Sequence, residues 1–323
     1  FMKFLITGGA GFLGSHLCEK YVNESEENKV ICLDNFSNGD LFNIRALLGH
    51  RNFKLVNGDI RDKDLIDKLM PGVDVLIHLA AQIHVDKSIV NPRETYDTNV
   101  LGTLNILESA RTHDPKKILL ASTSEVYGHA KYTPMDENHP LEAPHPYGAS
   151  KIAADRMALA YNKTYNLGVD IIRCFNFFGP RQKDSGYGGA ISIFTKRALN
   201  NQPPIIYGDG KQTRDYTYIK DVVRAYDLVM KRNNKNNDRI VNFGTGVEIS
   251  ILDLANKIIK IAEKDLKPVF VFPRPGEVDR LHCDYSKAKE LYNFTPEYTI
   301  DQGLTEFINW YRDFKSEEWT KTG

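Results

Sequence analysis

A glycine-rich segment directly after a short apolar run constrains the fold of this chain more than any other feature of its sequence. The run Met2 to Thr7 has the composition of a buried strand, and it leads into Gly8-Gly9-Ala10-Gly11-Phe12-Leu13-Gly14. A helical pattern follows through Leu13, Leu17 and Tyr21. Glycines at positions 8, 11 and 14 permit unusual dihedrals and let the backbone and a helix N-terminus approach a pyrophosphate. The segment therefore predicts a strand, turn and helix that bind a dinucleotide.

A second apolar run, residues 30–33, ends in Asp34, twenty residues after Gly14. A carboxylate at this distance from the glycine turn can bind the ribose hydroxyls of NAD and repel the additional phosphate of NADP. A glycine triplet alone would be weak evidence, but here the turn, the helix, the second strand and the acidic residue occur in one unit. The sequence therefore predicts NAD as the cofactor.

Strands and helices continue to alternate through the first half of the chain, with predicted strands at residues 53–56, 73–79, 118–121 and 169–175. Small or polar residues follow three of these strands, namely Asn57-Gly58-Asp59-Ile60, Ala80-Ala81-Gln82 and Ser122-Thr123-Ser124-Glu125. Repeated strand-helix units predict an α/β fold with a Rossmann-type, doubly wound parallel sheet whose ligands bind at the carboxyl ends of the strands. At those ends, Asp59 can reach the adenine and the two alanines admit the cofactor.

The pattern changes at about Phe177, where a loop-rich region begins with Gly179-Pro180-Arg181 and Gly186-Tyr187-Gly188-Gly189. Helices are predicted at 221–230, 251–263, 286–292 and 304–314, strands at 240–243 and 270–272, and a polar turn at 233–238. We therefore expect an NAD-binding domain of residues 2–176, to which 216–243 return. A smaller, interleaved α/β domain formed mainly by 177–323 is expected to bind the substrate.

The composition excludes several other classes of function. Among 323 residues, 42 are basic and 42 acidic, so the overall charge does not indicate a nucleic-acid or membrane surface. No apolar run is long enough to span a membrane, and the chain starts without the basic segment of a signal peptide. The four cysteines are far apart and form no C-x-x-C motif, which argues against disulfides and a metal site. We expect a cytoplasmic protein with no metal.

Tyr147 and Lys151, in Pro146-Tyr147-Gly148-Ala149-Ser150-Lys151, lie one turn apart if a helix begins here. Lowering the pKa of a tyrosine from ~10 to ~7 requires roughly 4 kcal/mol in favour of the phenolate. One ammonium at ~4 Å, in an effective dielectric of about 20, supplies on the order of 4 kcal/mol. Tyr147 is therefore a feasible general base, but the spacing alone does not distinguish it. The same spacing occurs at Tyr127/Lys131, Tyr207/Lys211, Tyr216/Lys220, Tyr285/Lys289 and Tyr311/Lys315.

Several motifs together resemble the extended short-chain dehydrogenase/reductase family, and within it the NAD-dependent nucleotide-sugar epimerases and dehydratases. The resemblance covers nearly the whole chain and rests on residues 7–14, His78-Leu79-Ala80-Ala81-Gln82, Asn99, Tyr147 with Lys151, and Arg173-Cys174-Phe175-Asn176. It implies a homodimer in which Tyr147 and Lys151 are catalytic and Thr123 shares the sugar hydroxyl. The cofactor-binding residues implied are Gly8, Gly11, Phe12, Leu13, Gly14, Asp34, Asn35, Asp59, Ile60, Leu79, Ala80, Ala81, Gln82, Asn99, Tyr147, Lys151 and Phe175.

The same resemblance implies how a nucleotide sugar is bound. The segments 212–216 and 274–277 are similar to those that bind the nucleoside diphosphate, and two arginines suit a pyrophosphate because each offers paired donors. For His84, the alternative is a histidine packed in a loop. The substrate-binding residues implied are His84, Thr123, Asn176, Arg181, Tyr207, Arg214, Arg274 and Glu277.

Two sets of residues favour different members of the family. Residues 123–128 and 84–88 resemble 4,6-dehydratases, which use an acid/base pair after the threonine, and Glu125 is present although Ser124 replaces an aspartate. That aspartate is common in one dehydratase branch, whereas other branches and the related UDP-glucuronate decarboxylases carry serine there, so the substitution excludes neither. Residues 214–221 and 274–277 resemble UDP-sugar 4-epimerases instead, and Leu281 leaves room where a bulky tyrosine restricts some epimerases to glucose and galactose.

The favoured interpretation is an isomerase, a UDP-sugar 4-epimerase acting on UDP-glucose/UDP-galactose or on the N-acetylated pair UDP-GlcNAc/UDP-GalNAc. A lyase, the 4,6-dehydratase using Glu125, is the second interpretation, and a UDP-glucuronate decarboxylase is the third. A non-catalytic NAD-binding sensor is the remote alternative, which the presence of Thr123, Tyr147 and Lys151 together disfavours.

Overall fold

The computed structural model describes residues 1–184, 189–232, 239–274 and 276–321. The predicted polar turn at 233–238, part of the loop at 186–189 and the proline at 275 therefore lie outside the described residues. The chain forms two compact units. Unit 1 comprises Phe1–Gly128, Pro140–Cys174 and Val223–Asn242, and unit 2 comprises His129–His139, Phe175–Val222 and Phe243–Gly323.

These bounds differ from the predicted domains in four places. Residues 129–139, 175–176, 216–222 and 243, which the sequence assigned to the first domain, belong to unit 2. The placement of His129–His139 has a structural cause, because Met135 pairs with Cys283 in an isolated parallel bridge of unit 2. The Met135 N–H donates to the His282 carbonyl at 2.8 Å, and the Asp284 N–H donates to the Met135 carbonyl at 2.9 Å.

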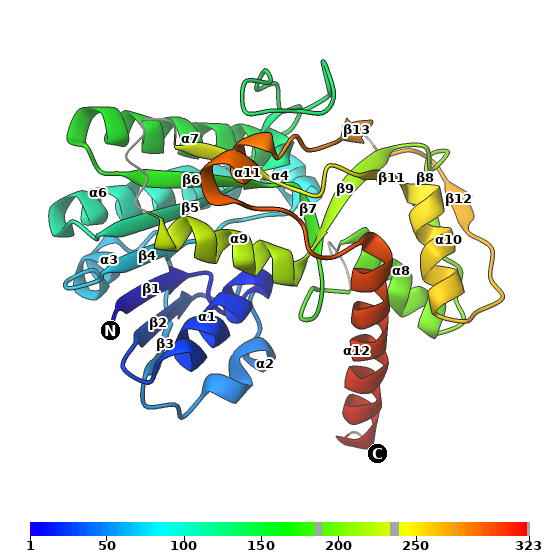
Figure 1. Cartoon of the computed structure of the whole chain (residues 1–323), viewed down its shortest axis with the longest axis horizontal. Coiled ribbons are helices and arrows are strands. Elements are labelled where there is room, and N and C mark those ends of the chain that lie inside the picture. The colour runs from blue at the N-terminus through cyan, green and yellow to red at the C-terminus, as the bar shows by residue number, and fades with distance from the viewer. Residues whose placement is uncertain (185–188, 233–238, 275, 322–323) are drawn as a thin grey trace. The chain divides into compact units, whose positions relative to one another are not determined.

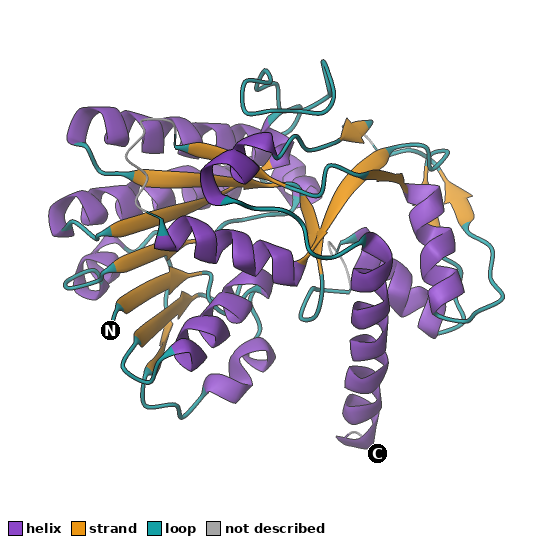
Figure 2. Cartoon of the chain, in the orientation of Figure 1, coloured by secondary structure: helices purple, strands orange, loops and turns teal. Residues whose placement is uncertain are grey.

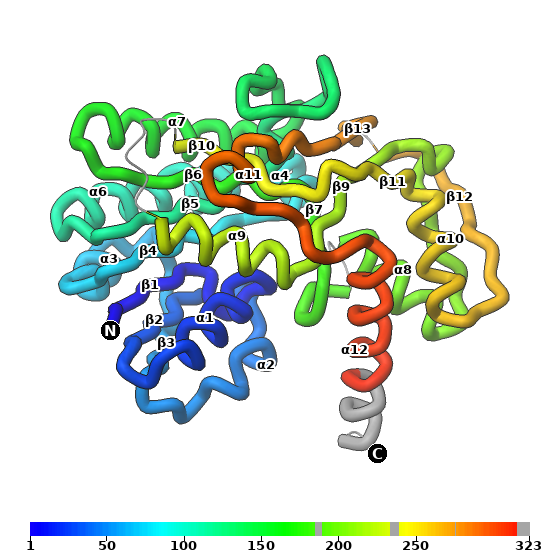
Figure 3. Tube along the Cα trace, viewed as in Figure 1, coloured from blue at the N-terminus to red at the C-terminus, as the bar shows by residue number. Residues whose placement is uncertain are grey.

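Unit 1 is built on a seven-stranded sheet in the order β10-β6-β5-β4-β1-β2-β3 (Figure 1). Its strands are β1 (Lys3–Thr7), β2 (Lys29–Asp34), β3 (Phe53–Asn57), β4 (Val75–His78), β5 (Lys117–Thr123), β6 (Val169–Cys174) and β10 (Ile240–Phe243). In the part of the sheet that runs from β6 through β5, β4, β1 and β2 to β3, each strand is parallel to its neighbours. The chain winds outward from β1 to β3 and then crosses back to β4 (Figure 3). This topology confirms the predicted Rossmann-type α/β fold.

Helices cover both faces of this sheet (Figure 2). Successive strand residues point to opposite faces. In β1, Phe4 stacks on Tyr21 of α1, whereas Leu5 belongs to a buried cluster with residues of α3, α6 and α7. Helix α1 therefore covers one face, and α3, α6 and α7 cover the other. The helical segments are α1 (Phe12–Glu24), α2 (Leu41–Ile44), η1 (Arg45–Leu47), α3 (Lys63–Leu69), α4 (Val85–Val90), α5 (Pro92–Tyr96), the π-helix η2 (Asp97–Gly102), α6 (Thr103–His113), η3 (Ser124–Val126), α7 (Pro146–Tyr165) and α9 (Ile219–Lys231).

Helix α7 carries the predicted Tyr147 and Lys151, and its sequence explains where it begins and ends. His145 is the N-cap, and its side chain accepts a hydrogen bond from the Gly148 N–H. Pro146 occupies the first helical position, where its missing N–H costs no hydrogen bond. The helix ends at Asn166, a left-handed C-cap. Tyr147 and Lys151 therefore lie in the first two turns, one above the other on the same side.

Unit 2 contains two small sheets. In one, β9 (Thr213–Tyr218) pairs with β7 (Asn176–Phe178), β11 (Glu248–Ser250) and β13 (Arg280–Leu281), and in the other β8 (Ile205–Tyr207) pairs with β12 (Val269–Val271). Its helices are α8 (Ala190–Leu199), α10 (Ile251–Ile261), α11 (Ser286–Tyr292) and α12 (Ile300–Lys321). Aromatic side chains of β7, β9 and α12 pack together, with Phe178 contacting Tyr218 and Phe307.

Two further predictions, on the cysteines and on membrane-spanning segments, can be compared with the residues that the structure describes. All four cysteines, which lie among the described residues, are buried and outside any disulfide, as small buried residues should be. A search of the described helices finds none with the length and apolar character required to cross a membrane.

Candidate active site

The glycine turn of unit 1 has the close contacts that a nucleotide-binding turn requires. Gly8 has a φ of +70°, and a Cβ at this position would lie 2.9 Å from the Ala80 backbone nitrogen at the end of β4. A Cβ on Gly14 would overlap the Gly8 carbonyl and lie 2.7 Å from the Gly9 Cα. Gly11 is the N-cap of α1 and has no side chain to cap the helix. The turn therefore presents backbone and a helix N-terminus where a pyrophosphate can approach, so the residues fit NAD.

The Asp34 carboxylate lies directly beside this turn. Its Oδ2 accepts a hydrogen bond from the Ala10 N–H at 2.9 Å, and its Oδ1 accepts one from the Phe36 N–H at 2.8 Å. These bonds hold the carboxylate at the end of β2, next to the glycine turn. A diol bound there would meet a fixed acceptor, as binding to the NAD ribose requires.

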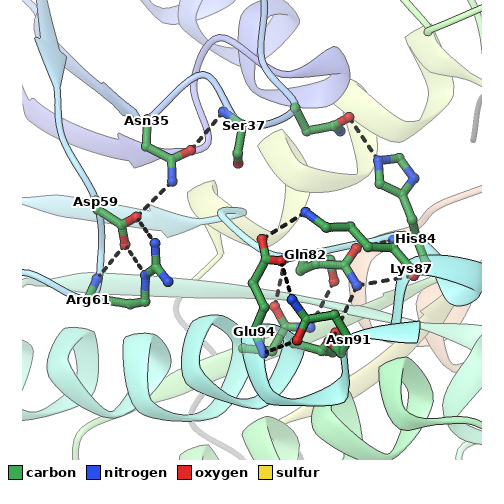
Figure 4. A network of polar contacts seen from close by, with 12 residues as sticks. Asn35, Ser37, Asp59, Arg61, Gln82, His84, Lys87, Asn91 and Glu94 are labelled. Atoms are coloured by element: carbon green, nitrogen blue, oxygen red, sulfur yellow. Dashed lines mark hydrogen bonds and ion pairs between the residues drawn. The ribbon is translucent and has the colours of Figure 1, made fainter. Parts of the chain in front are cut away.

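Asp59, predicted to reach the adenine, forms a polar cluster at the end of β3 (Figure 4). Arg61 donates to both carboxylate oxygens, at 2.9 and 2.7 Å, and the Asn35 amide donates to Oδ2 at 2.8 Å. The bonds from Arg61 lower the pKa of Asp59 to about 2. Asn35 and Asp59, two of the predicted cofactor-binding residues, are therefore in direct contact.

Gln82 and Asn99 link the end of β4 to helix α7. The Asn99 Oδ1 accepts the Gln82 N–H at 2.8 Å, and the Asn99 amide donates to the Gln82 carbonyl and to the Ser150 Oγ, both at 2.9 Å. Asn99 lies in the π-helix η2 and is buried. The predicted Leu79 and Ala80 also lie here, each donating its N–H to the Thr7 hydroxyl at 3.2 Å.

The phenol of Tyr147 is buried, and the Thr123 side chain at the end of β5 lies close enough to influence its pKa. The Tyr147 backbone N–H donates to the Ser88 Oγ of α4 at 3.1 Å, which fixes the start of α7. Burial raises the pKa of Tyr147 well above its usual range, and the charge of Glu125 raises it further, while the Thr123 side chain acts in the opposite direction. Without additional positive charge, Tyr147 is therefore a neutral phenol at pH 7.

Lys151 lies within the same buried region. Its Nζ donates to the Ala121 carbonyl of β5 at 2.6 Å. Burial lowers the pKa of Lys151 to about 8, although the charge of Asp155 opposes this change. Asp155 is itself buried and pairs with Arg173 at 2.9 Å. The structure thus places a lysine with a lowered pKa one helical turn from Tyr147.

Glu125 contacts a residue that the sequence interpretation missed. The His145 Nε2 lies 3.2 Å from the Glu125 Oε2, and the imidazole is nearly parallel to the Tyr147 ring, with 6.1 Å between centroids. The sequence gives one sign of a role for His145, namely its position immediately before a proline that starts a helix. That position predicts an N-cap and does not predict the contact with Glu125.

His84 has its own hydrogen-bond partners in unit 1 (Figure 4). Its Nε2 lies 3.0 Å from the Asn38 Oδ1, and its backbone N–H donates to the Gln82 side chain at 2.5 Å. It also stands at the N-cap of α4. Its predicted contact with substrate stays a prediction.

Unit 2 brings several of the predicted substrate-binding residues together. On β9, the Arg214 guanidinium lies 3.8 Å from the Glu277 carboxylate, and the Gln212 amide donates to Glu277 at 3.3 Å. The Arg274 guanidinium lies 3.9 Å from the centroid of the Tyr207 ring. Each arginine therefore already has a carboxylate or an aromatic face beside it.

Three other predicted residues lie around β7. Asn176 pairs in register with Tyr216 of β9, and its Oδ1 is buried without a hydrogen-bond partner among the described residues. Arg181 follows in the next loop with a φ of +73°. Phe175 is buried, and its N–H donates to the Phe243 carbonyl at 2.9 Å. The roles predicted for these residues in substrate and cofactor binding stay predictions.

Comparison with known proteins gives concordant matches. The sequence model of the GDP-mannose 4,6 dehydratase family matches residues 5–307. A Methanocaldococcus jannaschii protein, provisionally named UDP-glucose 4-epimerase, is 42% identical over 96% of this chain and 98% of its own. The UDP-glucose 4-epimerase of Thermotoga maritima, solved with UDP-glucose, has a TM-score of 0.91 at 32% identity and covers 97% of this chain and 100% of its own. The dTDP-glucose 4,6-dehydratase DesIV of Streptomyces venezuelae, with NAD bound, has a TM-score of 0.91 at 32% identity and covers 98% of each chain.

The fold and the site define an enzyme of the nucleotide-sugar epimerase and dehydratase class, with NAD as its cofactor. The chain belongs to the extended short-chain dehydrogenase/reductase family, which confirms the resemblance seen in its sequence. Epimerases, dehydratases and decarboxylases all occur among its relatives. The matches therefore support both an isomerase and a lyase.

Proposed function

We propose that the protein is an NAD-dependent UDP-sugar 4-epimerase, acting on UDP-glucose and UDP-galactose or on their N-acetylated counterparts. The observation that carries this proposal is the arrangement at the start of α7. There the buried Tyr147 phenol lies close enough to Thr123 for that side chain to lower its pKa, and Lys151 follows one turn later. A tyrosine beside a hydroxyl and an ammonium can take a proton from a sugar hydroxyl once positive charge has favoured its phenolate form.

In the proposed reaction, Tyr147 takes the proton from the 4-hydroxyl and later returns it, while Thr123 hydrogen-bonds the same oxygen. NAD, when bound, accepts the hydride from C4 and returns it, and its positive nicotinamide ring favours the phenolate. Lys151 adds a second positive charge, which opposes the effect of burial and of Glu125 on Tyr147. Rotation of the 4-keto sugar before the hydride returns inverts the configuration at C4.

Unit 2 supplies the groups proposed to bind the nucleotide. Arg214 and Arg274 suit a diphosphate because a guanidinium offers paired donors, and Glu277 beside Arg214 suits a ribose hydroxyl. Leu281 is buried and pairs in register with Arg214. A leucine here is smaller than a tyrosine, which supports a pocket that accepts an N-acetyl group at C2.

The test is to incubate the purified protein with UDP-glucose, UDP-N-acetylglucosamine, UDP-glucuronate, GDP-mannose and dTDP-glucose, and to identify each product by mass and chromatography. The proposal expects a product of unchanged mass with a new retention time from one UDP-hexose. Loss of one water from any of the substrates would identify a dehydratase instead, and loss of carbon dioxide from UDP-glucuronate would identify a decarboxylase.

A 4,6-dehydratase is the second candidate, and Glu125 is the observation that favours it. Its carboxylate is close enough to Tyr147 to raise the pKa of the phenol, so it lies within the same site. A dehydratase uses such a carboxylate on C5 of the sugar. Ser124 is buried and provides no second carboxyl group, but other dehydratase branches also carry serine there, so residue 124 does not distinguish the two candidates.

We also infer a homodimer in a reducing compartment, the cytoplasm. Leu101 and Tyr165, near the helices α6 and α7 that the family resemblance implicates, are 52% and 50% exposed, which supports an apolar interface there. Four cysteines outside any disulfide fit a reducing compartment. Sedimentation equilibrium tests the dimer, since a single species of monomer mass would contradict it.

A further inference from the structure

The contact between Glu125 and His145 has no role in the proton transfers assigned to Tyr147. The His145 side chain is 3% exposed and that of Glu125 is 20% exposed, so the contact is largely shielded from water. A polar contact in such a place restrains both side chains more than one on the surface. It lies beside the Tyr147 ring and therefore in the site where the sugar is expected.

The hydrogen bonds of His145 define its tautomer. The Nδ1 accepts the Gly148 N–H at 3.1 Å, so this nitrogen carries no proton. A neutral imidazole then carries its proton on Nε2, which donates to the Glu125 Oε2 at 3.2 Å. This assignment follows from the partners of the two nitrogens. One oxygen of Glu125 is therefore occupied by a fixed donor.

Both ends of the Glu125 residue are fixed. Its backbone N–H donates to the Thr123 Oγ1 at 3.2 Å, and its carboxylate accepts from His145. His145 is in turn fixed as the N-cap of α7 and lies at 13° to the Tyr147 ring. To take a proton from a sugar carbon, a carboxylate oxygen must come within hydrogen-bond distance of that proton. Glu125 can move toward a sugar only by breaking the bond with His145 or by using its other oxygen.

An unrestrained carboxylate beside a 4-keto sugar would cause a side reaction. The ketone acidifies the C5 hydrogen, so a base can take that proton while the C5–H electron pair moves into an enolate across C4 and C5. The pair then forms the C5=C6 bond as the C6–O bond breaks, and the hydroxyl leaves as water with the proton that the base took from C5. Return to C6 of the hydride first removed from C4, and of a proton to C5, completes a net loss of one water. Because residue 124 is a buried serine, Glu125 would have to be the base.

We propose that His145 is a specificity-determining residue that restrains the Glu125 carboxylate and so prevents the 4-keto intermediate from losing water. This inference rests on the proposed 4-epimerase function. It explains how a chain with the glutamate of a dehydratase can return its intermediate as an intact sugar. His145 acts through Glu125 and is a positioning residue, whereas Tyr147 and Thr123 act on the sugar itself.

The test separates the two hydrogen bonds of His145. Serine and threonine are good N-caps whose hydroxyl accepts a helix N–H, but neither reaches Glu125, so His145→Ser and His145→Thr keep the cap and remove the restraint. Wild type and variants are incubated with UDP-glucose and UDP-N-acetylglucosamine in deuterium oxide, and products are analysed by mass. We expect the variants to form a product lighter by one water, with deuterium at C5, at a rate about tenfold or more above wild type, as loss of one bond to a charged group implies.

The double variant His145→Ser/Glu125→Gln is the matched control, and it should lose the water-loss product while keeping the same cap. If wild type forms isomers and both folded cap variants also form isomers alone, without deuterium at C5, the inference about His145 is wrong and the 4-epimerase stands. If wild type itself releases water, the proposed function fails first. Thermal unfolding of each variant shows whether the cap is retained, and the threonine variant decides the matter if the serine variant is unstable.

Discussion

Replacing Lys151 by methionine should show how much the buried ammonium of Lys151 lowers the free energy of unfolding. Burial lowers the pKa of Lys151 from 10.5 to about 8. Because the folded pKa lies below the unfolded one, the unfolded chain binds more protons between these values, and stability rises with pH across that window. At 1.36 kcal/mol per pKa unit, the ammonium costs about 3 kcal/mol at pH 7 and about 1 kcal/mol at pH 9.5.

The measurable quantity is the difference in free energy of unfolding between wild type and Lys151→Met, determined by urea denaturation at pH 7 and pH 9.5. Methionine also leaves the Ala121 carbonyl without its donor, which costs about 1–3 kcal/mol at both pH values. The wild type should therefore gain about 2 kcal/mol relative to the variant between pH 7 and pH 9.5. Lys163→Met, in the exposed part of the same helix, is the matched control. A difference that does not change with pH would refute the reasoning.

Three further variants test other parts of the site. Tyr147→Phe should lower turnover by about 10²–10⁴-fold while Tyr161→Phe, in the same helix, should not, and turnover that survives in Tyr147→Phe would contradict the proton transfer. Asp155→Asn should lower the pKa of Lys151 further, since the Asp155 charge raises it, and so move the alkaline limb of the pH–rate profile to lower pH. The same change removes the negative charge that pairs with the buried Arg173, so urea denaturation should show that the free energy of unfolding falls by about 3–5 kcal/mol. Gly14→Ala should weaken NAD binding about tenfold or more in titration calorimetry, because the added Cβ overlaps the glycine turn.

The sheet of unit 1 could be predicted from the sequence because each of its strands is a compact apolar run followed by a turn signal. The 286–292 helix and the 240–243 strand agree with the predicted bounds, and the latter returns to the first sheet as expected. Strands such as β13, of two residues, and β7, of three, could not be predicted because segments so short show no periodicity. They form only because each of them pairs with β9, which lies in a distant part of the chain.

The same limit applies to the site. The spacing of Tyr147 and Lys151 within one helix is a local property, so the sequence places them together. The bond between His145 and Glu125 joins residues 20 positions apart across an irregular segment, and no periodicity relates them. The placement of His129–His139 in unit 2 has the same origin, since it depends on a bridge to Cys283.

The fate of the hydrogen at C4 tests the central claim most directly. UDP-glucose carrying deuterium at C4 should be incubated with the protein in ordinary water and the products examined by NMR. The proposed 4-epimerase predicts UDP-galactose in which the deuterium is still at C4, because the hydride leaves and returns to the same carbon. Deuterium at C6 of a 4-keto-6-deoxy sugar would show that the intermediate loses water, and it would contradict the account.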